Sequence, residues 1–288
     1  MKKLYLPLIY TIIIAASSPS SITQIINRES LTQEEFETCL NFDLSKYNIF
    51  NVPNLGSFYI NDNSTSLVKH TLKKGLIWEP KISNLIRLFA KPGSLAIDIG
   101  AHIGCHTVTM SECVGPLGQV LAFEPALNVF CELAVNIALN KCSNCTLYKY
   151  ALSNHTGEGI FNVFNHGEEL SSLRRTMLDN KTTKPYWSQE SVKIIRLDEL
   201  NLNNVSLSKI DVEGGQDNVI KGALQTIRHN KPIIIFEARD PVYYSQEFLG
   251  TEGFPTNKLL ESEGYMILWI ENSDWIALPA NMFKNMFA

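Results

Sequence analysis

The chain has 288 residues, of which 45% are hydrophobic, and its formal net charge is −4 at neutral pH. A chain of this size can bury the core of one large domain or of two small ones. Because lysine and arginine are not in excess, the composition argues against sustained binding to a nucleic-acid backbone, and we expect no nucleic-acid partner.

The first seventeen residues have a pattern of their own. Lys2 and Lys3 precede an apolar run at residues 4–16, which is shorter than the ~20 residues that a spanning helix needs. This pattern is typical of a secretory signal peptide. A short membrane anchor and an apolar element packed on the core remain open as alternatives. We expect residues 1–17 to lie outside the folded catalytic domain, and any membrane contact to occur only through residues 4–16.

The cysteines and the glycosylation sequons carry little information by themselves. Six cysteines are few for this length and do not predict a disulfide framework. Cys142 and Cys145 form a C-x-x-C pair, but a structural zinc site would need a second pair, so we expect an ordinary turn and no metal. Sequons of the form N-x-S/T, which matter only in a secretory pathway, occur at Asn63, Asn144, Asn154, Asn180 and Asn204.

Residues 18–75 are polar and irregular, and we interpret them as an N-terminal extension. Within them, residues 30–42 carry a capping-type start and predict a short helix. Residues 76–288 are expected to form the main domain, which begins with a helix at residues 80–90 because apolar residues recur there at helical spacing.

Strands and helices then alternate along the chain. Strands are expected at 95–100, 119–124, 145–152, 206–212 and 232–238, and helices at 103–114, 127–140, 216–230 and 257–265. A polar insertion after the third strand contains hairpin signals at 159–165 and 191–197. The last two strands, 265–270 and 274–280, are too close in sequence for a parallel crossover. The pattern predicts an α/β fold: a doubly wound, mostly parallel seven-stranded sheet with an antiparallel C-terminal hairpin.

Acidic residues follow four of the five core strands. Asp98, Glu124, Asp211 and Glu237 stand at these ends, and Glu213 follows closely after the fourth strand. Ligands of open α/β sheets bind outside the carboxyl ends of the strands, so packing or helix capping explains these acids less well than a binding site does.

The loop after the first strand argues for a cationic cofactor. A dinucleotide loop would read G-x-G-x-x-G, whereas Gly100 and Gly104 give G-x-x-x-G, and Asp98 would repel a pyrophosphate. S-adenosylmethionine carries an ammonium and a sulfonium instead, so we expect Asp98 to act on the cationic side of this cofactor, directly or by fixing the loop. Glu124 could accept hydrogen bonds from both hydroxyls of its ribose.

Six short motifs resemble the FkbM family of S-adenosylmethionine-dependent methyltransferases. Between residues 80 and 240 they read "DIGAHIGCHT", "AFEP", "YALSN", "RLDEL", "KIDVEGGQDNVIKGA" and "PIIIFE". The resemblance implies the class I, Rossmann-like methyltransferase fold and methyl transfer, usually to a hydroxyl oxygen of a sugar or natural product. It implies cofactor-binding positions at Asp98, Gly100, His102, Gly104, Glu124 and Ser153. Asp211 and Glu213 match the acidic motif at the active-site edge, and we expect catalysis there.

Two residues depart from the family pattern. His102 stands where the family usually has Asn, and Gln216 where it usually has Glu. Both departures support an alternative function, a degenerate methyltransferase fold that binds a ligand without catalysis. A nicotinamide-dependent oxidoreductase is the other, less favoured, alternative.

Three further observations leave the acceptor site open. Ser171 and Ser172 match a serine-containing stretch of the family, and they either line the acceptor pocket or are surface-loop serines. Lys209 is expected to be a solvated or snorkelling residue and not a catalytic one. His102 and His106 are four residues apart, but His102 is expected in a turn, so we expect no metal there.

The expected partner is a small-molecule or glycan acceptor. The signal-like segment favours the secretory pathway or a membrane, whereas a cofactor made in the cytosol favours the cytoplasm.

Overall fold

The computed structural model describes residues 19–164, 171, 173, 187–238 and 255–282. The signal-like segment 1–17, Ser172 and the sequon at Asn180 lie outside the described residues. Within the described part, no helix combines the length and the apolar character that crossing a membrane requires.

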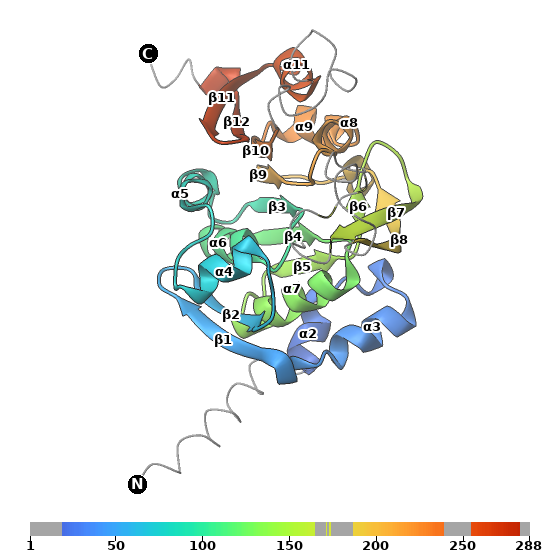
Figure 1. Cartoon of the computed structure of the whole chain (residues 1–288). Helices are drawn as coiled ribbons and strands as arrows, with labels where there is room; N and C mark the ends of the chain where they lie inside the picture. Colours follow the sequence, from blue (N-terminus) through green and yellow to red (C-terminus); the bar gives the residue numbers. More distant parts are fainter. Residues whose placement is uncertain (1–18, 165–170, 172, 174–186, 239–254, 283–288) are drawn as a thin grey trace.

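A seven-stranded sheet forms the centre of the molecule, in the order β11–β12–β10–β9–β3–β4–β5 (Figure 1). Its five parallel strands are β3 (Leu95–Ile99), β4 (Gln119–Phe123), β5 (Cys145–Tyr148), β9 (Val205–Ile210) and β10 (Ile233–Glu237). The hairpin of β11 (Tyr265–Glu271) and β12 (Asp274–Pro279) is antiparallel, and β12 pairs antiparallel with β10. The predicted fold class is therefore confirmed.

Helices cover both faces of this sheet. On one face lie α5 (Pro80–Phe89), α6 (Cys105–Val114) and α7 (Leu127–Leu139), and on the other α8 (Gln216–Lys221), α9 (Leu224–Asn230) and α11 (Pro255–Ser262). Successive strand residues point to opposite faces: in β3, Ala96 packs into the first core and Ile97 into the second. Every residue of β3 and β9 is buried. In β3 this explains why four of the five residues are apolar, whereas β9 also buries Ser206, Ser208 and Lys209.

The N-terminal extension has more regular structure than its sequence predicts. The helix in residues 30–42 forms as α3 (Gln33–Leu40), with a capping box at Thr32. The other elements were not predicted: α2 (Pro19–Ile25), β1 (Tyr47–Val52), β2 (Gly56–Asn61), α4 (Leu67–Lys73), and the short 3-10 turns η1 (Arg28–Ser30) and η2 (Leu44–Lys46).

The extension packs on α7. The side chain of Asn136 in α7 accepts a hydrogen bond from the backbone N–H of Tyr59 in β2 at 2.8 Å. Cys39 of α3 and Cys131 of α7 form a disulfide. The prediction that the cysteines form no framework missed this single bond because 92 residues separate the two cysteines. Cys142 and Cys145 are free thiols.

Three boundaries differ from the prediction. The third strand ends at Tyr148, and β6 (Ala151–Leu152) joins a separate three-stranded sheet. In that sheet β7 (Gly157–Phe164) and β8 (Trp187–Ile195) pair with each other, so the two hairpin signals are the arms of one hairpin. The turn η6 (Leu197–Leu200) follows. The helix expected at 216–230 is broken at Gly222, where an added Cβ would lie 1.9 Å from the carbonyl oxygen of Ser153.

Candidate active site

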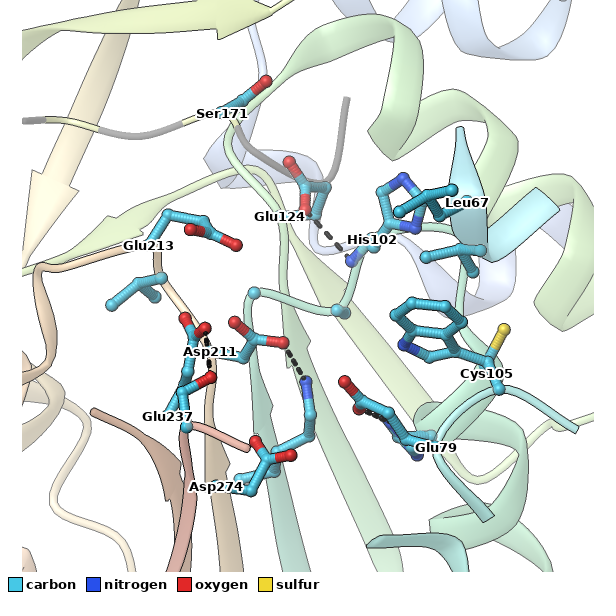
Figure 2. Close-up of a pocket in the computed structure, with 18 of the residues that line it drawn as sticks. Leu67, Glu79, His102, Cys105, Glu124, Ser171, Asp211, Glu213, Glu237 and Asp274 are labelled. Atoms are coloured by element: carbon cyan, nitrogen blue, oxygen red, sulfur yellow. Dashed lines mark hydrogen bonds and ion pairs between the residues drawn. The ribbon is translucent and has the colours of Figure 1, made fainter. Parts of the chain in front are cut away.

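A cavity of about 490 Å³ lies at the carboxyl ends of β3, β4, β9 and β10 (Figure 2). These ends contribute the loop 100–102, Glu124 with Pro125, residues 209–213, and Glu237. The turn 271–274 between β11 and β12 closes one side, and residues 67–68 and 78–80 close another. The cavity is therefore where the rule for open α/β sheets places a ligand.

The backbone after β3 requires its glycine. Gly100 has φ +80°, and a Cβ there would lie 1.8 Å from the carbonyl oxygen of Asp211. His102 also has a left-handed backbone, with φ 50°, and its N–H donates to Oε2 of Glu124 at 3.0 Å. Gly104 begins α6 with φ +97°, and its missing side chain makes room for Leu133 of α7. Gly100 and His102 line the cavity. Gly104 does not line it and packs against α7 instead.

Asp98 supports this loop from the buried side. It is fully buried and does not belong to the cavity lining. Its Oδ2 accepts a hydrogen bond from the hydroxyl of Thr107 in α6 at 2.6 Å, while Oδ1 has no hydrogen-bond partner among the described residues. This contact ties the end of β3 to α6, so Asp98 is placed to fix the loop. Its expected role toward the cofactor, directly or by fixing the loop, stays a prediction.

Glu124 faces the cavity from the end of β4, beside His102 (Figure 2). Its two oxygens accept backbone hydrogen bonds from His102 and Ala126, each at 3.0 Å. Burial raises the pKa of Glu124 to about 7, although these two hydrogen bonds act in the opposite direction. Each carboxylate oxygen can accept a second donor, so Glu124 can still bind ligand hydroxyls.

Ser153 lies apart from the main cavity. It is 4% exposed and lines a small side pocket of about 50 Å³. That pocket shares Gly100, Pro125 and Phe161 with the main cavity, so the two are neighbouring compartments of one site.

A buried ion pair lies at the other side of the cavity. Lys209 Nζ is 3.1 Å from Oδ2 of Asp211, and Lys209 is only 5% exposed. Burial disfavours its charge, but the carboxylates of Asp211, Asp98 and Glu79 outweigh it and raise the pKa of Lys209. The expectation that Lys209 is solvated or snorkelling is wrong, because its ammonium is held among carboxylates inside the fold.

Four carboxylates gather on this side, as Figure 2 shows for Asp211, Glu213, Glu237 and Asp274. Oxygens of the first three lie within 4.8 Å of one another, close enough to hold a hard cation. Ser273 Oγ donates to Glu237 at 2.9 Å. Burial and the neighbouring carboxylates Glu79, Asp211 and Glu237 raise the pKa of Asp274 to about 8.

The chain matches the family described as "Methyltransferase FkbM domain" over residues 98–272. It belongs to the FkbM methyltransferase family. It is 24% identical over 207 residues to Methyltransferase 1 of Beauveria bassiana, covering 66% of this chain and 79% of that protein.

Solved structures with a similar fold are more distant. An FkbM methyltransferase from Methylobacillus flagellatus is 15% identical with a TM-score of 0.42, over 92% of this chain and 58% of that one. A SAM-dependent O-methyltransferase from Thermotoga maritima is 13% identical with a TM-score of 0.41, over 80% of this chain and 76% of that one.

The two departures from the FkbM pattern leave the cavity intact. The loop contact of His102 is made by its backbone N–H, which every residue except proline provides. Burial lowers the pKa of the His102 ring, so the ring that lines the cavity is neutral. Gln216 begins α8 and is not part of the cavity lining.

Ser171, one of the two serines considered for the acceptor pocket, lines the cavity, and its Oγ accepts the N–H of Phe164. Sequence reasoning missed two other acids that line the cavity, Glu79, which contacts His106 Nε2 at 3.0 Å, and Asp274. Glu79 directly precedes α5 and Asp274 is the first residue of β12. No motif distinguishes these two residues from surface acids.

Proposed function

We propose that this FkbM family member is a methyltransferase that uses S-adenosylmethionine and methylates a hydroxyl of a sugar or natural-product-like acceptor, free or within a glycan. The observation that carries the proposal is the position of Glu124. It is a buried carboxylate at the end of β4, faces the cavity, and is hydrogen-bonded to the loop after β3.

The residues of the cavity fit this cofactor by charge and shape. Glu124 would hold the ribose hydroxyls, and the loop at residues 100–102 offers backbone without a side chain at Gly100. The carboxylates of Asp211, Glu213 and Glu237 favour a cationic ligand and would repel the pyrophosphate of a dinucleotide. A nicotinamide-dependent reaction is therefore the weaker alternative.

When bound, S-adenosylmethionine supplies an electrophilic methyl group on a sulfonium. The chain's own contribution is to place the acceptor hydroxyl and to take its proton. Alignment of the reacting groups can contribute roughly 7–11 kcal/mol, and a general base about 10²–10⁴-fold in rate. We propose Asp211 as the base or orienting group: Lys209 fixes its Oδ2, and the carboxylate lines the cavity. Glu213 is the second candidate, because it lines the same wall.

Calorimetry tests the cofactor, and a methyl-transfer assay tests the catalysis. Wild-type protein titrated with S-adenosylmethionine should release heat with one site per chain, while a nicotinamide dinucleotide should give none. A chain that does not bind S-adenosylmethionine would contradict the proposal, and a chain that binds only the dinucleotide would be an oxidoreductase. A chain that binds S-adenosylmethionine and transfers no methyl group would be the degenerate binding module.

A further inference from the structure

The disulfide between Cys39 and Cys131 indicates where the chain folds. Both cysteines are completely buried, and their bond joins α3 of the N-terminal extension to α7 of the main domain. Disulfides of this structural kind form and persist in oxidising compartments and are rare in the cytosol. Of the free thiols, Cys105, Cys142 and Cys145 are buried inside the fold.

The structure also divides the glycosylation sequons into two kinds. The side chain of Asn144 is built into the fold: its Nδ2 donates to the carbonyls of Ser111 at 3.0 Å and Gly115 at 2.9 Å. Both N–H groups are used, so a sugar on this nitrogen would break a hydrogen bond in a partly buried position. Asn204 likewise donates from Nδ2, to the carbonyl of Gly93 at 3.1 Å.

Asn63 and Asn154 differ from these two. Asn63 is exposed in the turn between β2 and α4, and Asn154 is exposed in the turn between β6 and β7. Neither Nδ2 donates a hydrogen bond to another described residue, and Asn154 Oδ1 contacts only the neighbouring His155 ring, at 3.1 Å. An oligosaccharide on either nitrogen would extend into solvent without disturbing the fold.

We infer that this chain matures in an oxidising compartment that transfers N-linked oligosaccharides, and that Asn63 and Asn154 are its glycosylation sites. In the transfer, Nδ2 of the asparagine forms a bond to the anomeric carbon of an oligosaccharide carried on a polyprenyl pyrophosphate. The bond from that carbon to the pyrophosphate oxygen breaks, the polyprenyl pyrophosphate leaves, and the amide loses one proton. The inference rests on the disulfide and on the sequons, and it holds whether or not the proposed methyl transfer is correct.

The test is expression of the full chain, with its own N-terminus, in cultured insect cells. Mass spectrometry after peptide-N-glycosidase treatment should find Asn63 and Asn154 converted to Asp, and Asn144 unchanged. Asn154→Gln should remove one oligosaccharide, and so should Thr65→Ala, which destroys the sequon of Asn63 and keeps the asparagine. Asn144→Gln should leave the number of oligosaccharides unchanged.

Thiol alkylation of the denatured, unreduced protein provides a second readout. Cys39 and Cys131 should escape alkylation until a reductant is added, while the other four cysteines react at once. A protein of unmodified sequence mass, with all six cysteines alkylated, would overturn the inference. An oligosaccharide on Asn144 together with bare Asn63 and Asn154 would also overturn it.

Discussion

Glu124 should make cofactor binding depend on pH near neutrality. Its pKa is raised to about 7 in the free protein, mainly by burial. Ribose hydroxyls donate hydrogen bonds, and these favour the ionised carboxylate. Only the ionised form of Glu124 can accept both of these hydrogen bonds. The apparent Kd for S-adenosylmethionine should therefore rise as the pH falls through 7. With a pKa of about 7, the protonated fraction grows from about a tenth at pH 8 to about nine tenths at pH 6, which weakens binding about tenfold.

The assay is calorimetry with S-adenosylmethionine at several pH values, on wild-type protein and on Glu124→Gln. The variant should bind about 10- to 150-fold more weakly, which corresponds to the loss of about 1.5–3 kcal/mol for a charge-assisted hydrogen bond. The affinity of this variant for S-adenosylmethionine should also no longer change with pH near 7. Asp274 is the matched control, because its pKa is raised to about 8. Asp274→Asn should keep the change of affinity near pH 7 that Glu124 causes. A wild-type affinity that stays constant from pH 6 to pH 8 would refute the ribose role of Glu124.

The same pKa shift has a consequence for the stability of the free protein. The folded pKa of Glu124 lies above its ordinary value of 4.5, so the folded state holds a proton that the unfolded state releases between pH 4.5 and 7. The contribution of Glu124 to the free energy of unfolding therefore falls as the pH rises through this window. Denaturant titrations of wild-type protein and Glu124→Gln should differ in pH dependence in this window, and equal dependence would contradict the raised pKa.

The remaining predictions concern the wall opposite Glu124 and the loop. Asp211→Asn should lower single-turnover methyl transfer by about 10²-fold or more and leave cofactor affinity within a few-fold; transfer at the wild-type rate would move the base to Glu213. Lys209→Met leaves the Asp211 carboxylate, whose side chain is 29% exposed, without its buried partner and should cost about 1–3 kcal/mol in denaturant unfolding, and an unchanged stability would show that the pair does not stabilise the fold. Gly100→Ala should abolish cofactor binding because its Cβ would clash with a backbone oxygen, whereas Gly93→Ala, at a similar φ with open space around it, should keep it.

The sequence predicts the part of the fold whose signals are local. Strand β3 is buried on both faces, so its apolar run stands out, and the short turn before β12 forces an antiparallel hairpin. The acids at strand ends follow from the same reasoning, since parallel strands bring Glu124, Asp211 and Glu237 to one edge.

Other features depend on contacts between distant segments, which no local pattern contains. The pairing of Cys39 with Cys131 and the burial of Lys209 among three carboxylates arise only when separate elements meet. Asp98 illustrates the limit within the site itself. Its position at the end of β3 is legible in the sequence, but the direction of its side chain, toward Thr107 and away from the cavity, is decided by the packing of α6.

A methyl-transfer assay decides whether the protein is an O-methyltransferase. The full-length protein, incubated with S-adenosylmethionine carrying a labelled methyl group and a panel of hydroxyl-bearing sugars and natural products, should place the label on an acceptor oxygen. This label should appear with wild-type protein and be strongly reduced with Asp211→Asn. A protein that binds S-adenosylmethionine in calorimetry but labels no acceptor hydroxyl, or labels a nitrogen or carbon instead, would contradict the proposed function.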